Sequence, residues 1–325
     1  MASLSKIIDV HSHPILPFGE GAPMGKGQKQ PDWSVESALS YMEENGITAC
    51  VLSSPASAND ATGQKARDIA RRTNETLAEI VSKHPKRFGA VATLPALDAD
   101  GALAEISYAL DTLKLDGVTT TTSHNDTYLG EAQFDPWLEE LNRRSATLFV
   151  HPTTTKAGKT LLIGLNDSIL EFVFDTTRMI TNMVVTGSKK RFSRIKIIST
   201  HGGGTIPYLV NRIQTLEHTF GVGPGRLELS PEEVGEGIAS FYYDLTAATS
   251  EAQLYAILKL VPVSQLLMGF DFPLMPKSSF APAIADVGRY SAFSETDLRS
   301  ISYANAFCLY PELAKRNEQG TQRTP

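Results

Sequence analysis

Histidines dominate the residues of this chain that could do chemistry. His11 and His13 lie two positions apart in the run Asp-Val-His-Ser-His. Alternate residues of a β-strand point to the same side, so both imidazoles can reach one metal ion if this run ends a strand. His-x-His also occurs by chance, and its position in the fold therefore has to support a metal-binding role.

Three further residues follow apolar runs in the same way. His151 comes after Leu-Phe-Val, His201 after Ile-Ile-Ser-Thr, and Asp271 after Leu-Met-Gly-Phe. One polar residue at a strand end is ordinary, but this many at successive strand ends indicate a shared site. Imidazole and carboxylate ligands with an open coordination position suit a catalytic divalent ion, with zinc first and manganese or magnesium as alternatives.

The elements that must position these residues alternate along the chain. Val/Ile/Leu-rich runs bounded by polar residues predict strands at 6–10, 49–53, 89–93, 116–121, 147–150, 195–199, 241–245 and 265–269. Segments between them predict helices at 34–45, 63–84, 99–113, 134–144, 167–187, 206–219, 250–260 and 294–309. Eight strands alternating with helices predict an α/β fold, the (β/α)8 TIM barrel. A doubly wound open sheet is the alternative.

The domain organisation follows from the same pattern. No repeat or shift in composition divides the chain, so we expect one domain over residues 1–325. Long connections at about 12–33 and 152–166 would lie at the C-terminal face, where barrel enzymes keep their active sites. The polar stretch at about 316–325 is expected to be a disordered tail.

Composition argues against several classes of partner. The net charge of −6 provides no basic surface for nucleic acid and no polybasic membrane patch. The chain has no apolar run of membrane-spanning length and no evident secretory signal, so we expect a cytoplasmic protein. Cys50 and Cys308 both lie in apolar runs and are expected to be buried free thiols, which fits a reducing compartment.

Other polar residues leave two interpretations open. His124 follows the fourth predicted strand and could face a substrate or simply pack. Arg178 lies on an otherwise apolar predicted helix, where an arginine is either solvated or clamps an anion. The glycines at 202–204 are expected to let the backbone turn tightly, so that His201 faces the metal.

Together these motifs resemble the amidohydrolase superfamily. The His-x-His, the His-Pro at 151–152, the His-Gly-Gly-Gly at 201–204 and the Gly-Phe-Asp-Phe-Pro at 269–273 are similar to its decarboxylase branch, the group of α-amino-β-carboxymuconate-ε-semialdehyde decarboxylase. Within that branch, Tyr-Ala-Leu-Asp-Thr-Leu at 108–113 and Phe-Asp-Thr-Thr-Arg at 174–178 resemble the 6-methylsalicylate decarboxylases of polyketide pathways. The resemblance extends over roughly 6–313.

The resemblance implies a division of roles within one site. It assigns the binding of one divalent metal ion to four residues, His11, His13, His151 and Asp271. His201 would be the catalytic histidine, and Asp271 would also deliver a proton. Hydrolytic members carry a bridging lysine after the fourth strand, where this chain has only threonines and a serine at 119–123, which argues for a single ion.

The implied reaction is decarboxylation of a small aromatic acid of the salicylate type, 6-methylsalicylate to m-cresol and CO2, without an organic cofactor. A metal-dependent hydrolase of a lactone or amide is the alternative. An aromatic substrate needs apolar walls, and we expect contacts from Phe18, Trp33 and Phe272, with Arg178 and His124 beside them. Each of these aromatic residues also suits a hydrophobic core. Relatives in this branch are usually dimers, which implies a homodimer.

Overall fold

The computed structural model describes residues 4, 6–17, 29–58, 61–161, 163–220 and 223–318, with the backbone alone at 56–57 and 216–220. Phe18 and half of the expected loop at 12–33, residues 18–28, therefore lie outside the described residues.

Eight parallel strands form one sheet in the order in which they occur along the chain. They are β1 (Ile8–Ser12), β2 (Ala49–Leu52), β3 (Phe88–Thr93), β4 (Gly117–Thr121), β7 (Thr147–His151), β8 (Lys196–Ser199), β9 (Tyr242–Asp244) and β10 (Leu266–Leu267). The segment after β10 returns to β1, because Val10 N donates to Met268 O at 3.0 Å and Asp271 N donates to His11 O at 2.7 Å. The sheet therefore closes into the predicted barrel rather than the open alternative.

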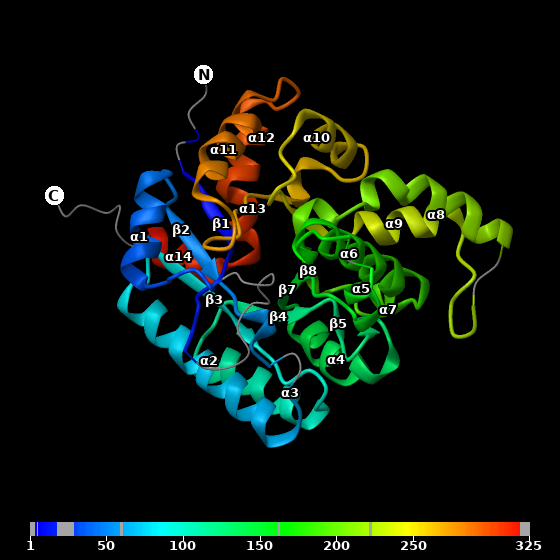
Figure 1. Ribbon diagram of the computed structural model, residues 1–325, viewed down its shortest axis with the longest axis horizontal. Helices are drawn as coiled ribbons and strands as arrows, with labels where there is room; N and C mark the ends of the chain where they lie inside the picture. Colours follow the sequence, from blue (N-terminus) through cyan, green and yellow to red (C-terminus); the bar gives the residue numbers. More distant parts are fainter. Residues whose placement is uncertain are drawn as a thin grey trace.

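Helices surround the strands on the outside of the barrel (Figure 1). Their bounds are α1 (Val35–Glu44), α2 (Gly63–Lys83), α3 (Ala99–Ser107), α4 (Asp135–Arg144), α5 (Lys156–Lys159), α6 (Asp167–Val185), α7 (Ser188–Arg191), α8 (Ile206–Phe220), α9 (Pro231–Ala239), α10 (Glu251–Leu258), α11 (Phe280–Arg289), α12 (Glu295–Arg299), α13 (Asn305–Leu309) and α14 (Pro311–Glu318). Local signals explain their ends. Ser34 caps α1 and exchanges hydrogen bonds with Ser37, a capping box.

The core has two parts, which follow from the alternation of side chains along each strand. On β7, Leu148 and Val150 pack outward against the helices, whereas Phe149 joins a smaller cluster with residues of β1, β2, β3, β8 and β10. Residues from so many strands can meet only inside the barrel. His151, two positions after Phe149, therefore faces the interior at the strand's carboxyl end.

Three expectations are corrected by the structure. The fourth strand is followed by a two-stranded hairpin, β5 (Ser123–His124) and β6 (Thr127–Tyr128), which the pattern did not predict. Arg316 belongs to α14 and forms an ion pair with Asp116 at 2.9 Å, so the expected disordered tail cannot begin there. Cys308 is exposed instead of buried, whereas Cys50 is buried as expected, and both are free thiols.

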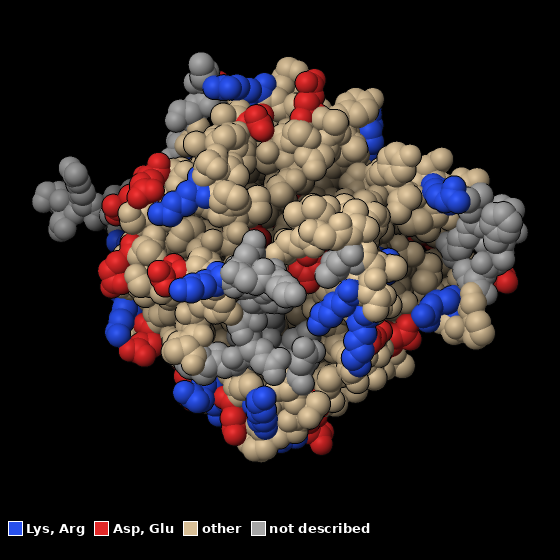
Figure 2. All heavy atoms as spheres, in the orientation of Figure 1, with Lys and Arg blue, Asp and Glu red and all other residues tan. Residues whose placement is uncertain are grey.

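The surface agrees with the modest net charge. On the face drawn in Figure 2, acidic and basic side chains of the described residues are intermixed around the rim, without a large patch of one sign. In the described part of the chain, every helix is too short or too polar to cross a bilayer.

Candidate metal centre

The predicted site residues converge at the carboxyl ends of the strands. One ligand atom from each of His11, His151, His201 and Asp271 lies within 4.8 Å of the others. His13 belongs to the same cluster, since its Nε2 lies 3.0 Å from His11 Nε2 and 3.1 Å from Asp271 Oδ1. The structure therefore brings together all five residues that the strand-end pattern selected.

Hydrogen bonds on the outer side of the imidazoles orient their inner nitrogens. His13 Nδ1 lies 2.9 Å from the carbonyl oxygen of Ser53, and His151 Nδ1 lies 2.8 Å from that of Pro152. A carbonyl oxygen only accepts, so both histidines carry their proton on Nδ1. Their Nε2 atoms are then left with a free lone pair directed at the centre, which is the form that binds a metal.

Two buried atoms at the centre have no hydrogen-bond partner among the described residues, His151 Nε2 and Asp271 Oδ1. Leaving a buried polar atom unsatisfied costs roughly 1–3 kcal/mol. A divalent cation would satisfy both a lone pair and a carboxylate oxygen at once. The donor set and its orientation thus fit a bound metal ion.

The electrostatic environment favours the metal-binding forms of His11, His151 and Asp271. Burial lowers the pKa of His11, and it lowers the pKa of His151 well below its usual value, so both imidazoles are neutral. Burial opposes ionisation of Asp271, but His11, His13 and His201 outweigh it and hold the pKa of this carboxyl well below its usual value. For His13, burial lowers the pKa, but the hydrogen bond and the charge of Asp271 outweigh burial and raise it. The Asp271 carboxylate and the neutral His11 and His151 are in the forms that can bind a divalent ion.

Two site residues have an unusual backbone. His201 has a φ of 54° and Asp271 a φ of 57°, in the left-handed region that residues other than glycine seldom occupy. Such conformations persist where the surroundings hold them, and they gather at functional sites. After His201 the chain turns through Gly204, where a Cβ would collide with the carbonyl oxygen of Val173. This close approach explains Gly204, whereas a Cβ at Gly202 would meet Ala248 and one at Gly203 would meet the ring of Tyr243.

A family model described as Amidohydrolase matches residues 8–311. The chain belongs to this family. It is 32% identical to decarboxylase yanB of Aspergillus niger, over 94% of this chain and 87% of that protein. It is 31% identical to a 6-methylsalicylic acid decarboxylase of Penicillium expansum, over 94% of this chain and 96% of that protein.

Solved structures support the barrel of this amidohydrolase. A crystal structure of a dihydroxybenzoic acid decarboxylase from Polaromonas, with bound manganese and 2-nitroresorcinol, superposes with a TM-score of 0.78 at 20% identity, covering 94% of this chain and 97% of that one. A 5-carboxyvanillate decarboxylase from Sphingomonas paucimobilis reaches a TM-score of 0.83 at 21% identity, covering 94% and 99%. At these identities the likeness shows a shared fold.

Asp244 of this amidohydrolase is a site residue that the sequence analysis missed. It ends β9, and its Oδ2 lies 2.9 Å from His11 Nδ1. Its Oδ1 accepts from the backbone N of His201 at 3.1 Å. The predicted strand at 241–245 placed Asp244 inside the strand, whereas β9 ends at Asp244 and so brings it to the same edge as His151 and Asp271.

The residues that were predicted to contact a substrate differ from one another in their environment. His124 is buried with its Nε2 2.7 Å from Thr120 Oγ1, and Phe272 is a core residue whose ring stacks on Tyr41 with 4.2 Å between centroids. Trp33 is partly buried and packs against the outer core, and Arg178 is exposed on α6. Contact of these residues with a substrate stays a prediction.

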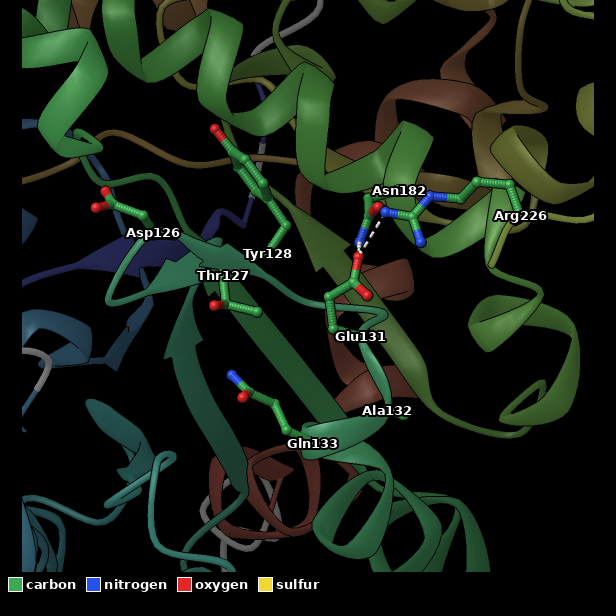
Figure 3. A pocket seen from close by; sticks show the side chains of 8 residues that line it. All are labelled: Asp126, Thr127, Tyr128, Glu131, Ala132, Gln133, Asn182 and Arg226. Atoms are coloured by element: carbon green, nitrogen blue, oxygen red, sulfur yellow. Dashed lines mark hydrogen bonds and ion pairs between the residues drawn. The ribbon is translucent and has the colours of Figure 1, made fainter. Parts of the chain in front are cut away.

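Two cavities lie near this end of the amidohydrolase barrel. One of about 290 Å³ touches His201 and is lined mainly by apolar groups, including Ala248, Ala252, Ala256 and Ile257. A second, of about 500 Å³, lies by the β5–β6 hairpin, where Arg226 and Asn182 both point at Glu131 (Figure 3). The second cavity shares no lining residue with the metal centre, so the first is the better place for a substrate.

Proposed function

We propose that this amidohydrolase is a metal-dependent carboxy-lyase that converts 6-methylsalicylate, or a closely similar aromatic acid, to m-cresol and CO2. The observation that carries the proposal is the buried centre in which His151 Nε2 and Asp271 Oδ1 have no hydrogen-bond partner among the described residues. The 6-methylsalicylic acid decarboxylase of Penicillium expansum, 31% identical, supports the reaction and the substrate.

His11, His13, His151 and Asp271 would hold the ion. A divalent metal bound there would supply the positive charge that keeps the carboxylate and phenol oxygens of a salicylate in one orientation. The ligand types favour zinc, whereas the dihydroxybenzoic acid decarboxylase with bound manganese favours manganese. A single ion is proposed because β4 ends in threonines, without a lysine that could bridge two ions.

Asp271 and His201 would transfer one proton during the reaction. Direct loss of CO2 would leave a poorly stabilised aryl carbanion, so protonation of the carboxylate-bearing ring carbon has to come first. Asp271 is ionised at rest, and we propose that it takes the phenol proton of the substrate and transfers it to that carbon. Cleavage of the C–C bond then releases CO2 and restores the aromatic ring, and the phenolate takes one proton from water.

His201 would orient or relay this proton. Its Nε2 lies 3.9 Å from Asp271 Oδ2, close enough for a small shift to bring the two into hydrogen-bond contact. The cavity beside His201 offers apolar groups to a substituted ring. Contacts from Arg178, Trp33, His124, Phe18 and Phe272, a homodimer, a cytoplasmic location and a polyketide pathway belong to the same proposal.

Carboxyl-labelled substrates test this function. The full chain, with its metal content measured, is incubated with 6-methylsalicylate, salicylate and 2,6-dihydroxybenzoate labelled with 13C at the carboxyl carbon. We expect labelled CO2 and m-cresol, with the highest kcat/KM for 6-methylsalicylate. Failure to release CO2 from any of them, together with hydrolysis of lactones or amides, would identify the enzyme as a hydrolase instead.

A further inference from the structure

We infer that Asp244 is a positioning residue that fixes the tautomer of His11 and so determines whether this histidine can bind the metal. The inference rests on the metal centre of the proposed function. Strand β9 supplies no ligand to that centre, yet it supplies the carboxylate that contacts both a ligand and the catalytic histidine's backbone.

The partners of Asp244 determine what each of its oxygens can do. The side chain is completely buried. Its Oδ1 accepts from two backbone amides, His201 N at 3.1 Å and Thr246 N at 3.0 Å. Backbone amides only donate, so Oδ1 is committed as an acceptor. Oδ2 faces His11 Nδ1 at 2.9 Å, which leaves it to accept from the imidazole.

This arrangement places the proton of His11 on Nδ1. The other ring nitrogen, Nε2, lies 3.0 Å from His13 Nε2 and keeps its lone pair for a cation. His13 and His151 obtain the same tautomer from backbone carbonyls. Two hydroxyls also lie near these nitrogens, Thr246 Oγ1 at 3.1 Å from His11 Nδ1 and Ser53 Oγ at 3.2 Å from His13 Nδ1, and a hydroxyl can either donate or accept. Among the hydrogen-bond partners of these three Nδ1 atoms in the described residues, the carboxylate of Asp244 is the one side chain that can only accept, so the tautomer of His11 is the one that a substitution of this carboxylate can reverse.

The substitution Asp244→Asn is expected to reverse the tautomer of His11. The two backbone amides still require an oxygen acceptor, so the amide oxygen of the new side chain must occupy the position of Oδ1. Its NH2 group then faces His11 Nδ1 and donates to it, which requires Nδ1 to be unprotonated. The proton of His11 moves to Nε2, where it blocks the metal.

Two measurements on the full chain test the inference. The first is the affinity for Zn2+ and for Mn2+, each added alone, which should fall about 10–100-fold in Asp244→Asn. The second is 15N NMR of the histidine side chains in metal-free protein, which should show His11 protonated at Nδ1 in the wild type and at Nε2 in the variant. Neither readout depends on turnover.

Asp116→Asn is the matched control. Asp116 is also a buried carboxylate, but it pairs with Arg316 and contacts none of the metal-site residues. We expect this variant to bind both ions within about twofold of the wild type, because only the carboxylate beside His11 sets a ligand's tautomer. An equal loss in both variants would reduce the effect of Asp244 to general destabilisation and contradict the inference.

The outcomes separate the inference from the proposed function. Unchanged affinity in a folded Asp244→Asn protein overturns the inference. Protonation of wild-type His11 at Nε2 also overturns it, and this result needs no variant. A wild type that binds neither ion contradicts the proposed metal-dependent function, while the NMR measurement still decides the role of Asp244.

Discussion

The carboxylate of Asp271 would combine the two proposed functions, metal binding and proton transfer, in one buried side chain. It faces His11 and His13 at 3.5 and 3.1 Å, and its other oxygen lies 3.9 Å from His201. The low pKa of Asp271 means that its carboxyl group is ionised at rest. Its left-handed backbone, held by the hydrogen bond to His11 O, directs the side chain into the barrel.

The substitution Asp271→Asn should leave the fold intact and reduce turnover. The amide keeps the size of the side chain but cannot carry a proton to the ring, so we expect kcat to fall by about 10²–10⁴. Turnover is measured on protein saturated with metal, with circular dichroism to establish folding. Asp100→Asn, an exposed carboxylate at the start of α3, should leave kcat unchanged. Wild-type turnover in the metal-replete Asp271→Asn protein would exclude Asp271 as the proton donor.

At this scale the sequence predicted which residues lie together at the candidate centre, but not the hydrogen bonds around them. Polar residues at strand ends identified the histidines and Asp271, because strands in a parallel barrel bring their carboxyl ends together. Asp244 follows the same rule, but the predicted strand at 241–245 extended one residue beyond it, so it was not recognised as a residue at a strand end. The stacking of Phe272 on Tyr41 depends on how α1 packs, which the local sequence does not encode.

At the scale of elements, α14 is attached by a contact between distant parts of the chain. Arg316 pairs with Asp116, whose side chain is only 1% exposed, just before β4. The buried carboxylate would lack its counter-charge without this helix. The polar composition of the last residues suggested disorder, whereas the ion pair and the burial of Leu313 in the core keep the helix in place.

Arg316→Ala should therefore destabilise the fold. Removing the guanidinium leaves the Asp116 carboxylate buried and unpaired, and we expect the free energy of unfolding to fall by about 1–3 kcal/mol. Chemical denaturation measures this loss. Lys315→Ala is the matched control, since Lys315 is 64% exposed and pairs with an exposed Glu312, and its effect should stay within about 0.5 kcal/mol.

The Asp116–Arg316 ion pair also predicts that the stability lost in Arg316→Ala depends on pH. Burial raises the pKa of Asp116, and Arg316 opposes that rise. Loss of Arg316 raises this pKa further, so protonation on acidification relieves the unpaired charge in the variant. The stability deficit of Arg316→Ala should shrink as pH falls, which denaturation at several pH values measures. A deficit that stays constant over the acidic range would contradict this electrostatic explanation.

Most elements were predictable because their patterns are local. All eight barrel strands lie where apolar runs predicted them, although β10 has only two residues because the chain bends toward β1 soon after Leu267. The β5–β6 hairpin was missed because each strand has two residues, too few for an alternating pattern. Helix α9 was missed too, although Ser230 and Glu233 form a capping box at its start.

At the scale of the whole molecule, the metal centre links strands from opposite ends of the sequence. The proposed ligands come from the end of β1, from β7 and from the segment after β10, where the barrel closes. A bound ion would therefore hold the two edges of the sheet together as well as serve catalysis. Binding to the folded state alone adds about 2.7 kcal/mol when the free ion is at 100 times its Kd.

Exhaustive chelation should accordingly stop turnover and lower Tm by several degrees, and added Zn2+ or Mn2+ should restore both. Calorimetry and a CO2 assay on the same samples measure the two effects together. The variant Asp271→Asn provides a comparison, because its Tm should respond less to chelation. An unaffected rate after the metal has been removed completely would take the ion out of the mechanism.

The closure of the barrel also has a consequence for biosynthesis. The first predicted ligand is residue 11 and the last is residue 271, on strands that are neighbours only in the finished fold. A nascent chain leaves the ribosome from its N-terminus. His11 and His13 are therefore synthesised early, and Asp271 emerges only after most of the chain has been translated. The complete set of proposed ligands then exists only after the eighth strand has been made, so loading of the proposed ion would be a late event in the maturation of this protein.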